Sequence, residues 1–258
     1  MQLTTLDYAL WALSTALQVG VCIFVLRSRT YRSLPLFSAY AWLNLLSLAF
    51  GWWVYLRLGY SSRLSFYITW IAVGVVLLAR GLAVGELCQR ILRPYRGVWA
   101  LGWRLLVGVA ILLLVFAGLA AYGARDGIKT FLLTAERGLE LAAAIILLLL
   151  LVISSYYRIP VPKLEGMLAL GLGVWSLLLV ANDAALALWP KYFPWGRAVR
   201  MASFQAVLLI WIAALRKPAL HEAAAPLLLA QTVYDELAPQ TNLRLRLLND
   251  RLLEIFKA

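Results

Sequence analysis

Long apolar runs, separated by short charged or proline-containing segments, dominate the chain. A hydrocarbon layer of about 30 Å requires roughly 20 mostly apolar residues per spanning helix, and the runs have this length. The expected spans are Tyr8–Leu26, Pro35–Leu56, Ser65–Leu92, Trp99–Tyr122, Lys129–Tyr157, Glu165–Leu188 and Arg197–Leu215. Strands of a membrane barrel would alternate apolar and polar side chains, whereas Leu141–Ile153 is continuously apolar. We therefore expect an all-α, polytopic seven-transmembrane-helix bundle over residues 1–217.

Composition agrees with a location in a membrane. Hydrophobic residues make up 64% of the chain and charged residues 14%, whereas soluble proteins contain about 25% charged residues. The formal net charge of +12 does not indicate nucleic-acid binding, because the Lys and Arg residues lie mainly between the apolar runs and form no basic stripe. We expect the lipid bilayer as a partner, and no nucleic acid.

The basic residues of the short loops are divided unequally between the two sides of the expected bundle. One side carries Arg27, Arg29, Arg32, Arg90, Arg93, Arg96, Arg158, Lys163, Arg216 and Lys217. The other side carries the smaller set Arg57, Arg63, Arg125, Lys129, Lys191, Arg197 and Arg200. Because cytoplasmic loops are enriched in Lys and Arg, we expect an N-out/C-in orientation. The first span has no cationic segment before it and is expected to be retained as a signal anchor.

Several chemical classes lack the residues that they need. His221 is the one histidine, so histidine-dependent zinc, haem and serine–histidine sites are not expected. Arg197–Leu215 contains no lysine for a retinal Schiff base, and the chain has no P-loop motif. Cys22 and Cys88 are expected to be reduced packing residues. We expect no metal, no cofactor and no catalytic residue, and the prediction leans away from an enzyme.

Carboxylates inside the expected spans are costly in lipid and therefore need a partner or a function. Glu136 and Glu140 are four residues apart, so they share one face of their helix. Asp183, next to Asn182, is expected at a comparable depth in the outer half of the bundle. The three carboxylates are expected to converge if the helix faces that carry them meet.

Arginines are available near these carboxylates as counter-charges, namely Arg80, Arg137 and Arg200. One hypothesis is an outward-open polar pocket that binds a small polar or cationic ligand or passes protons or cations, lined by Glu136, Glu140, Asp183, Asn182, Arg80 and Arg137. The other hypothesis is a network of ion pairs that locks the helices together. The sequence leaves both open.

A second charged pair is expected toward the cytoplasmic face. Glu86 and Arg104 lie on consecutive expected helices at similar depth, and we expect a structural ion pair in preference to a reaction centre. Gly81 and Gly85 form a G-x-x-x-G motif, which favours close helix packing within the bundle, with a homodimer contact as the alternative.

Residues 218–258 form the expected cytoplasmic tail, with an amphipathic helix at 242–256. Its apolar residues Leu245, Leu248, Leu252 and Ile255 recur at helical spacing among basic residues. A basic amphipathic helix favours the inner leaflet surface, and docking to a protein partner or to a second copy of the chain is the alternative.

Part of the third expected span resembles a pattern in uncharacterised seven-helix inner-membrane proteins of bacteria. The residues that carry the resemblance are Phe66, Tyr67, Trp70, Leu78, Glu86 and Leu87. The resemblance implies a bacterial inner (plasma) membrane location, and these proteins have no established activity to transfer.

Together these features predict a non-enzymatic integral membrane protein. The leading hypothesis is a sensor or receptor-like bundle with an outer-half polar pocket for a small ligand and a tail that contacts a cytoplasmic or membrane protein partner. A small transporter, or a proton- or cation-coupled carrier, is the first alternative, and an accessory subunit of a membrane complex is the second.

Overall fold

The computed structural model describes residues 5–59, 62–92, 96–124, 127–156, 161–189 and 193–216, together with Leu243, Leu247 and Asp250. These parts of the chain are helical and contain no strand. The helices are α1 (Thr5–Arg27), α2 (Thr30–Ser33), α3 (Pro35–Leu58), α4 (Arg63–Ile91), α5 (Arg96–Tyr122), α6 (Gly127–Tyr156), α7 (Lys163–Leu188) and α8 (Phe193–Arg216). The all-α fold is thereby confirmed. Most of the expected tail helix at 242–256 lies outside the described residues.

Five of these helices are long and apolar enough to cross a membrane within the described residues, namely α1, α4, α5, α7 and α8. The two other long helices are α3 and α6. In α6, Glu136, Arg137 and Glu140 precede the apolar run Leu141–Ile153. The membrane character expected from the apolar runs is confirmed by the five helices.

Proline and glycine mark several helix ends. Pro35 occupies the first turn of α3, and Pro162 immediately precedes α7. Proline suits these positions because the first amides of a helix need no partner within it. At the other end of α3, Gly59 has a φ of 75°, a conformation that glycine adopts without a steric cost. The sequence did not indicate the short helix α2, which forms the corner between α1 and α3.

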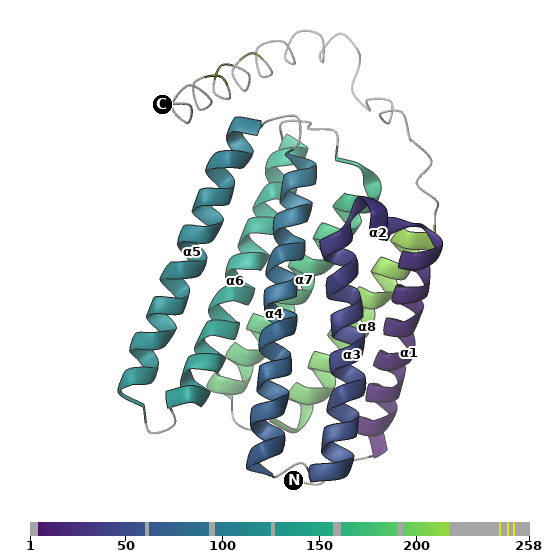
Figure 1. Cartoon of the computed structure of the whole chain (residues 1–258), viewed down its shortest axis with the longest axis vertical. Helices are drawn as coiled ribbons and strands as arrows, with labels where there is room; N and C mark the ends of the chain where they lie inside the picture. Colours follow the sequence, from purple (N-terminus) through teal and green to yellow (C-terminus); the bar gives the residue numbers. More distant parts are fainter. Residues whose placement is uncertain are drawn as a thin grey trace.

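The long helices run alternately up and down and lie side by side (Figure 1). Helix α8 packs against α1 and α7, α3 packs against α4, and α6 lies between α5 and α7. Helix α4 also contacts α6 and α7. In contrast, α5 stands at the edge of the bundle, and only 6% of its apolar span is buried inside the protein (Figure 1).

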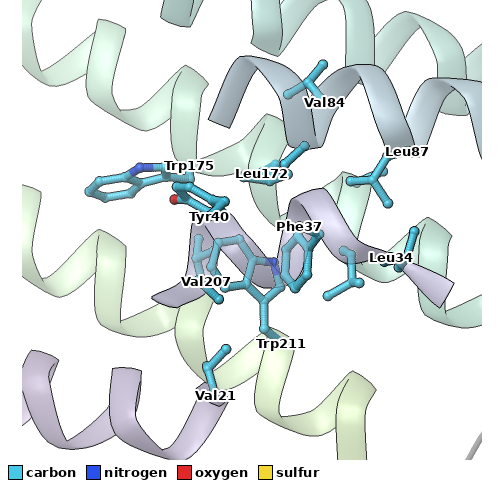
Figure 2. Close-up of a cluster of buried hydrophobic side chains, with 14 of the residues drawn as sticks. Val21, Leu34, Phe37, Tyr40, Val84, Leu87, Leu172, Trp175, Val207 and Trp211 are labelled. Carbon is cyan, nitrogen blue, oxygen red and sulfur yellow. The ribbon is translucent and has the colours of Figure 1, made fainter. Parts of the chain in front are cut away.

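Aromatic side chains fill the centre of the bundle (Figure 2). The ring of Trp211 on α8 is fully buried and meets Phe37 of α3 edge-on, with the ring centroids 5.4 Å apart. Gly171 of α7 makes room for this indole, because a Cβ atom at that position would lie 2.9 Å from Trp211 Cδ1. The absence of a side chain at Gly171 therefore permits the close approach of α7 and α8.

Candidate functional site

A buried ion pair lies inside the bundle. Arg80 of α4 donates a hydrogen bond to Glu140 of α6 through Nη1 and Oε1. The exposed fractions are only 8% for Arg80 and 3% for Glu140. The other carboxylate oxygen accepts a hydrogen bond from Ser176 Oγ of α7, at 2.5 Å. One carboxylate thus joins three helices through hydrogen bonds that are strengthened by its charge.

An aromatic side chain completes this centre. The Arg80 guanidinium lies over the ring of Tyr40 from α3, with 5.6 Å between Cζ and the ring centroid. Tyr40 is fully buried and meets Trp211 edge-on (Figure 2). Neither Arg80 Nε nor the Tyr40 hydroxyl has a hydrogen-bond partner among the described residues. The centre therefore contains polar groups whose hydrogen-bonding capacity is not fully used.

Two further ion pairs lie closer to the end of the bundle at which α6 begins. Arg200 Nη2 of α8 lies 3.1 Å from Glu136 Oε1 of α6, and Arg137 Nε of α6 lies 3.3 Å from Asp183 Oδ2 of α7. The arginine side chains are 44% and 50% exposed, whereas their carboxylate partners are 13% and 16% exposed. The outer part of the site thus presents guanidinium groups and shelters the carboxylates.

Helical rise places the outer pairs and the buried pair at different depths. Glu136 lies about 14 Å along α6 from its start at Gly127, and Glu140 lies one turn, or about 6 Å, deeper. Asp183 is near the end of α7 and Arg200 is near the start of α8, and both of these ends are at the same side of the bundle (Figure 1). The two outer pairs therefore lie nearer to that side of the bundle, and the Arg80–Glu140 pair lies about one helical turn deeper.

The structure pairs the expected outer-half carboxylates with the available arginines, as the ion-pair hypothesis describes. Arg80 meets Glu140 and Arg137 meets Asp183, and Asn182 is buried next to Asp183. Sequence reasoning missed Ser176 and Tyr40. A signal existed for Ser176, which precedes Asp183 by two helical turns and so shares its face. No comparable signal identified Tyr40, because an aromatic residue in an apolar span resembles ordinary packing.

Glu86 has a role that the sequence did not suggest. Its buried carboxylate Oε2 accepts a hydrogen bond from the Phe37 backbone amide, at 2.8 Å. Phe37 lies in the first turn of α3, where amides have no partner within the helix and the helix dipole favours negative charge. Glu86 therefore caps α3 from α4. Arg104 is exposed on α5 and takes part in an interaction. The expected ion pair between Arg104 and Glu86 stays a prediction.

The two glycines of the G-x-x-x-G motif have different surroundings. A Cβ atom on Gly85 would lie 3.3 Å from Trp103 Cζ3 of α5, whereas one on Gly81 would have nothing within 4 Å. Gly85 thus contributes to the packing of α4 against α5. A homodimer contact at Gly81 stays a prediction.

Comparison with known proteins adds no functional information. No protein-family model matches the sequence, and neither a curated protein nor a solved structure matches it. The resemblance of the third expected span to bacterial inner-membrane proteins stays a prediction. Within the residues that the structure describes, no three His, Cys, Asp or Glu side chains are grouped so that they could hold a metal ion.

Proposed function

We propose that α1, α3, α4, α5, α6, α7 and α8 each cross a bacterial inner membrane, with the N-terminus outside and the tail in the cytoplasm. The alternating helix directions and the uneven distribution of basic loop residues support this topology (Figure 1). The positions of α3 and α6, which pack among the five apolar helices, support their assignment as spans.

Cysteine labelling tests this topology. We expect Ser62→Cys to react with a membrane-impermeant maleimide added to intact cells, and Ser155→Cys to react only after the membrane is permeabilised. The natural Cys22 and Cys88 are 1% and 2% exposed, so the background reaction should be low. Labelling of both introduced cysteines from the same side would contradict the topology.

For the function itself, we propose a non-enzymatic sensor or receptor-like bundle that binds a small ligand at the outer ion pairs. The observation that carries the proposal is the unequal exposure of the pairs, in which Arg137 and Arg200 are about half exposed and their partners are not. Because the guanidinium groups are accessible, an incoming group can contact Arg137 or Arg200 without first opening the bundle.

The exposed groups support a ligand with an anionic part, whereas the sequence alone favoured a polar or cationic ligand. A carboxylate or phosphate can accept two parallel hydrogen bonds from one guanidinium. A ligand that takes Arg200 from Glu136 removes an ion pair between α8 and α6, and one that takes Arg137 from Asp183 removes an ion pair between α6 and α7. The bundle with this ion pair and the bundle without it would be the two conformational states between which a sensor switches.

Ligand binding can be measured on the full chain in lipid nanodiscs, with a panel of small carboxylates, phosphates and quaternary amines. We expect anions to raise the thermal unfolding temperature, and Arg137→Gln or Arg200→Gln to weaken their binding about tenfold or more, as expected for a lost charged hydrogen bond. Glu136→Gln is expected to strengthen binding because it frees Arg200.

Arg57→Gln is the matched control, because Arg57 is an exposed arginine at the end of α3 and belongs to none of the described ion pairs. Stabilisation by amines in place of anions would contradict the anionic ligand. An equal effect of Arg57→Gln would contradict the assignment of the site to Arg137 and Arg200.

A carrier is the second candidate, because Glu140 is a buried carboxylate in the interior of the bundle with a cationic partner. Buried carboxylates of this kind occur in proton relays. Uptake of ligand or protons into proteoliposomes that is abolished by Glu140→Gln would favour the carrier over the sensor. The role of an accessory subunit stays a prediction, which copurification of a stoichiometric partner would support.

A further inference from the structure

A groove of about 440 Å³ lies between the end of α6 and the start of α7. Most of its lining is apolar and includes Leu151, Met167 and Leu170. Three polar side chains also line it, namely Ser154, Ser155 and Lys163. The groove therefore combines a long apolar wall with a small polar region, and it lies apart from the three ion pairs of the candidate site.

Ser154 and Ser65 are buried serines whose hydroxyls have no hydrogen-bond partner among the described residues, and of the two only Ser154 lines the groove. Serine hydroxyls in helices commonly donate to the carbonyl four residues earlier, as Ser14 does to Leu10 and Ser38 does to Leu34. The Ser154 hydroxyl has no partner among the described residues, although the residue is only 1% exposed. A buried hydroxyl without a partner is costly, and at this position it lines the groove. The Ser154 hydroxyl therefore has hydrogen-bonding capacity left for a group bound in the groove.

The start of α7 adds positive charge at the same place. No side chain caps the helix at Pro162, so the amides of its first turn are available to an anion. Lys163 is exposed and has no ion pair with any described residue. Glu165 is the one acidic residue of this turn, and it is two positions from Lys163, so the two side chains do not share a face. The polar region of the groove is therefore suited to a negatively charged group.

The groove lies at the end of the bundle that carries the basic last turns of three other helices. These turns contain Arg27 of α1, Arg90 of α4 and Arg216 of α8. In the topology proposed above, this end is the cytoplasmic face, where anionic phospholipids face the protein. Basic pockets between helices on this side bind anionic lipid head groups in other membrane proteins.

We propose that this groove is a binding site for an anionic phospholipid of the inner leaflet. Its phosphate accepts hydrogen bonds from the Ser154 hydroxyl, the Lys163 ammonium group and the first amides of α7. An acyl chain of the same lipid lies along Leu151, Met167 and Leu170. The site depends on the membrane location of the bundle and is independent of the proposed ligand at the outer ion pairs.

The site can be tested on the full chain by native mass spectrometry, with phosphatidylglycerol and phosphatidylcholine added at known concentrations. We expect selective retention of phosphatidylglycerol. Lys163→Gln is expected to weaken its binding about fivefold, the effect of one lysine near an anionic lipid. Ser154→Ala is expected to weaken binding in the same direction, and Lys163→Arg is expected to retain it. Met167→Trp, which narrows the apolar part without a change of charge, should also reduce retention.

Two control variants distinguish the groove from general attraction to charge. Lys129→Gln removes the same charge from the first turn of α6, at the opposite end of that helix, and Ser38→Ala removes a buried hydroxyl that already has a partner. Both should bind the lipid as the unmodified chain does. Equal retention of the two lipids, or equal losses in Lys129→Gln and Lys163→Gln, would overturn the proposal. Displacement of the lipid by millimolar inorganic phosphate would overturn the assignment of the site to a phospholipid.

Discussion

Replacement of Glu140 by alanine is expected to lower the free energy of unfolding by about 3–5 kcal/mol, because it leaves the buried Arg80 guanidinium without its counter-charge. Arg80 and Glu140 are both largely inaccessible, so water cannot replace the lost partner at low cost. The loss of the Ser176 hydrogen bond acts in the same direction. Unfolding of the full chain in mixed micelles, followed by tryptophan fluorescence, measures this quantity.

Two comparisons separate the loss of a buried charge partner from the general effect of a substitution. Glu136→Ala breaks an ion pair whose arginine is 44% exposed, and it should cost at most about 1 kcal/mol. The double variant Arg80→Met/Glu140→Leu removes both charges and should be much less destabilised than Glu140→Ala alone. If Glu140→Ala and Glu136→Ala had the same effect, Arg80 would not depend on Glu140.

Trp211→Ala is the second substitution with a large expected effect, a loss of about 3–5 kcal/mol in the free energy of unfolding. The indole is fully buried among Phe37, Tyr40 and Gly171, so its removal leaves a cavity where α3, α7 and α8 meet (Figure 2). The same unfolding assay measures the loss. Trp195→Ala is a matched control, because Trp195 also lies on α8 but is 66% exposed, and its effect should be far smaller.

Gly171 provides an internal check on this packing. Gly171→Ala is expected to cost about 1–3 kcal/mol, because the added methyl group collides with the Trp211 ring. In the Trp211→Ala background the same change should cost much less, since the indole is no longer there. Additive losses would contradict a direct contact between the two residues.

The positions of the helices followed closely from the sequence. Long apolar runs such as Trp99–Tyr122 predicted helices where the structure has them, and Pro35 and Pro162 lie at helix starts. These features are local, because the length of an apolar run and the missing amide of proline act within one segment of the chain. The corner helix α2 was missed because four residues carry too little periodicity to be recognised.

Which charged groups meet could not be read from the same patterns. Arg80 and Glu140 are 60 positions apart in the chain, and their contact depends on how α4 and α6 are rotated about their axes. Glu86 illustrates the difficulty. Its depth alone suggested Arg104 as its partner, whereas in the structure its carboxylate accepts a hydrogen bond from the Phe37 backbone amide. An unpaired backbone amide at a helix start leaves no mark in the sequence of another helix.

The sequence by itself therefore determined that this is an all-helical membrane protein with carboxylates and arginines concentrated in the middle of the chain. It did so because the bilayer restricts each segment separately, in length, polarity and backbone hydrogen bonding. Only the tertiary structure decided that Glu140 is held by Arg80 and Ser176, and that the exposed groups of the outer pairs are arginines. The reason is that side-chain partners depend on helix rotation and packing, which are properties of the whole bundle.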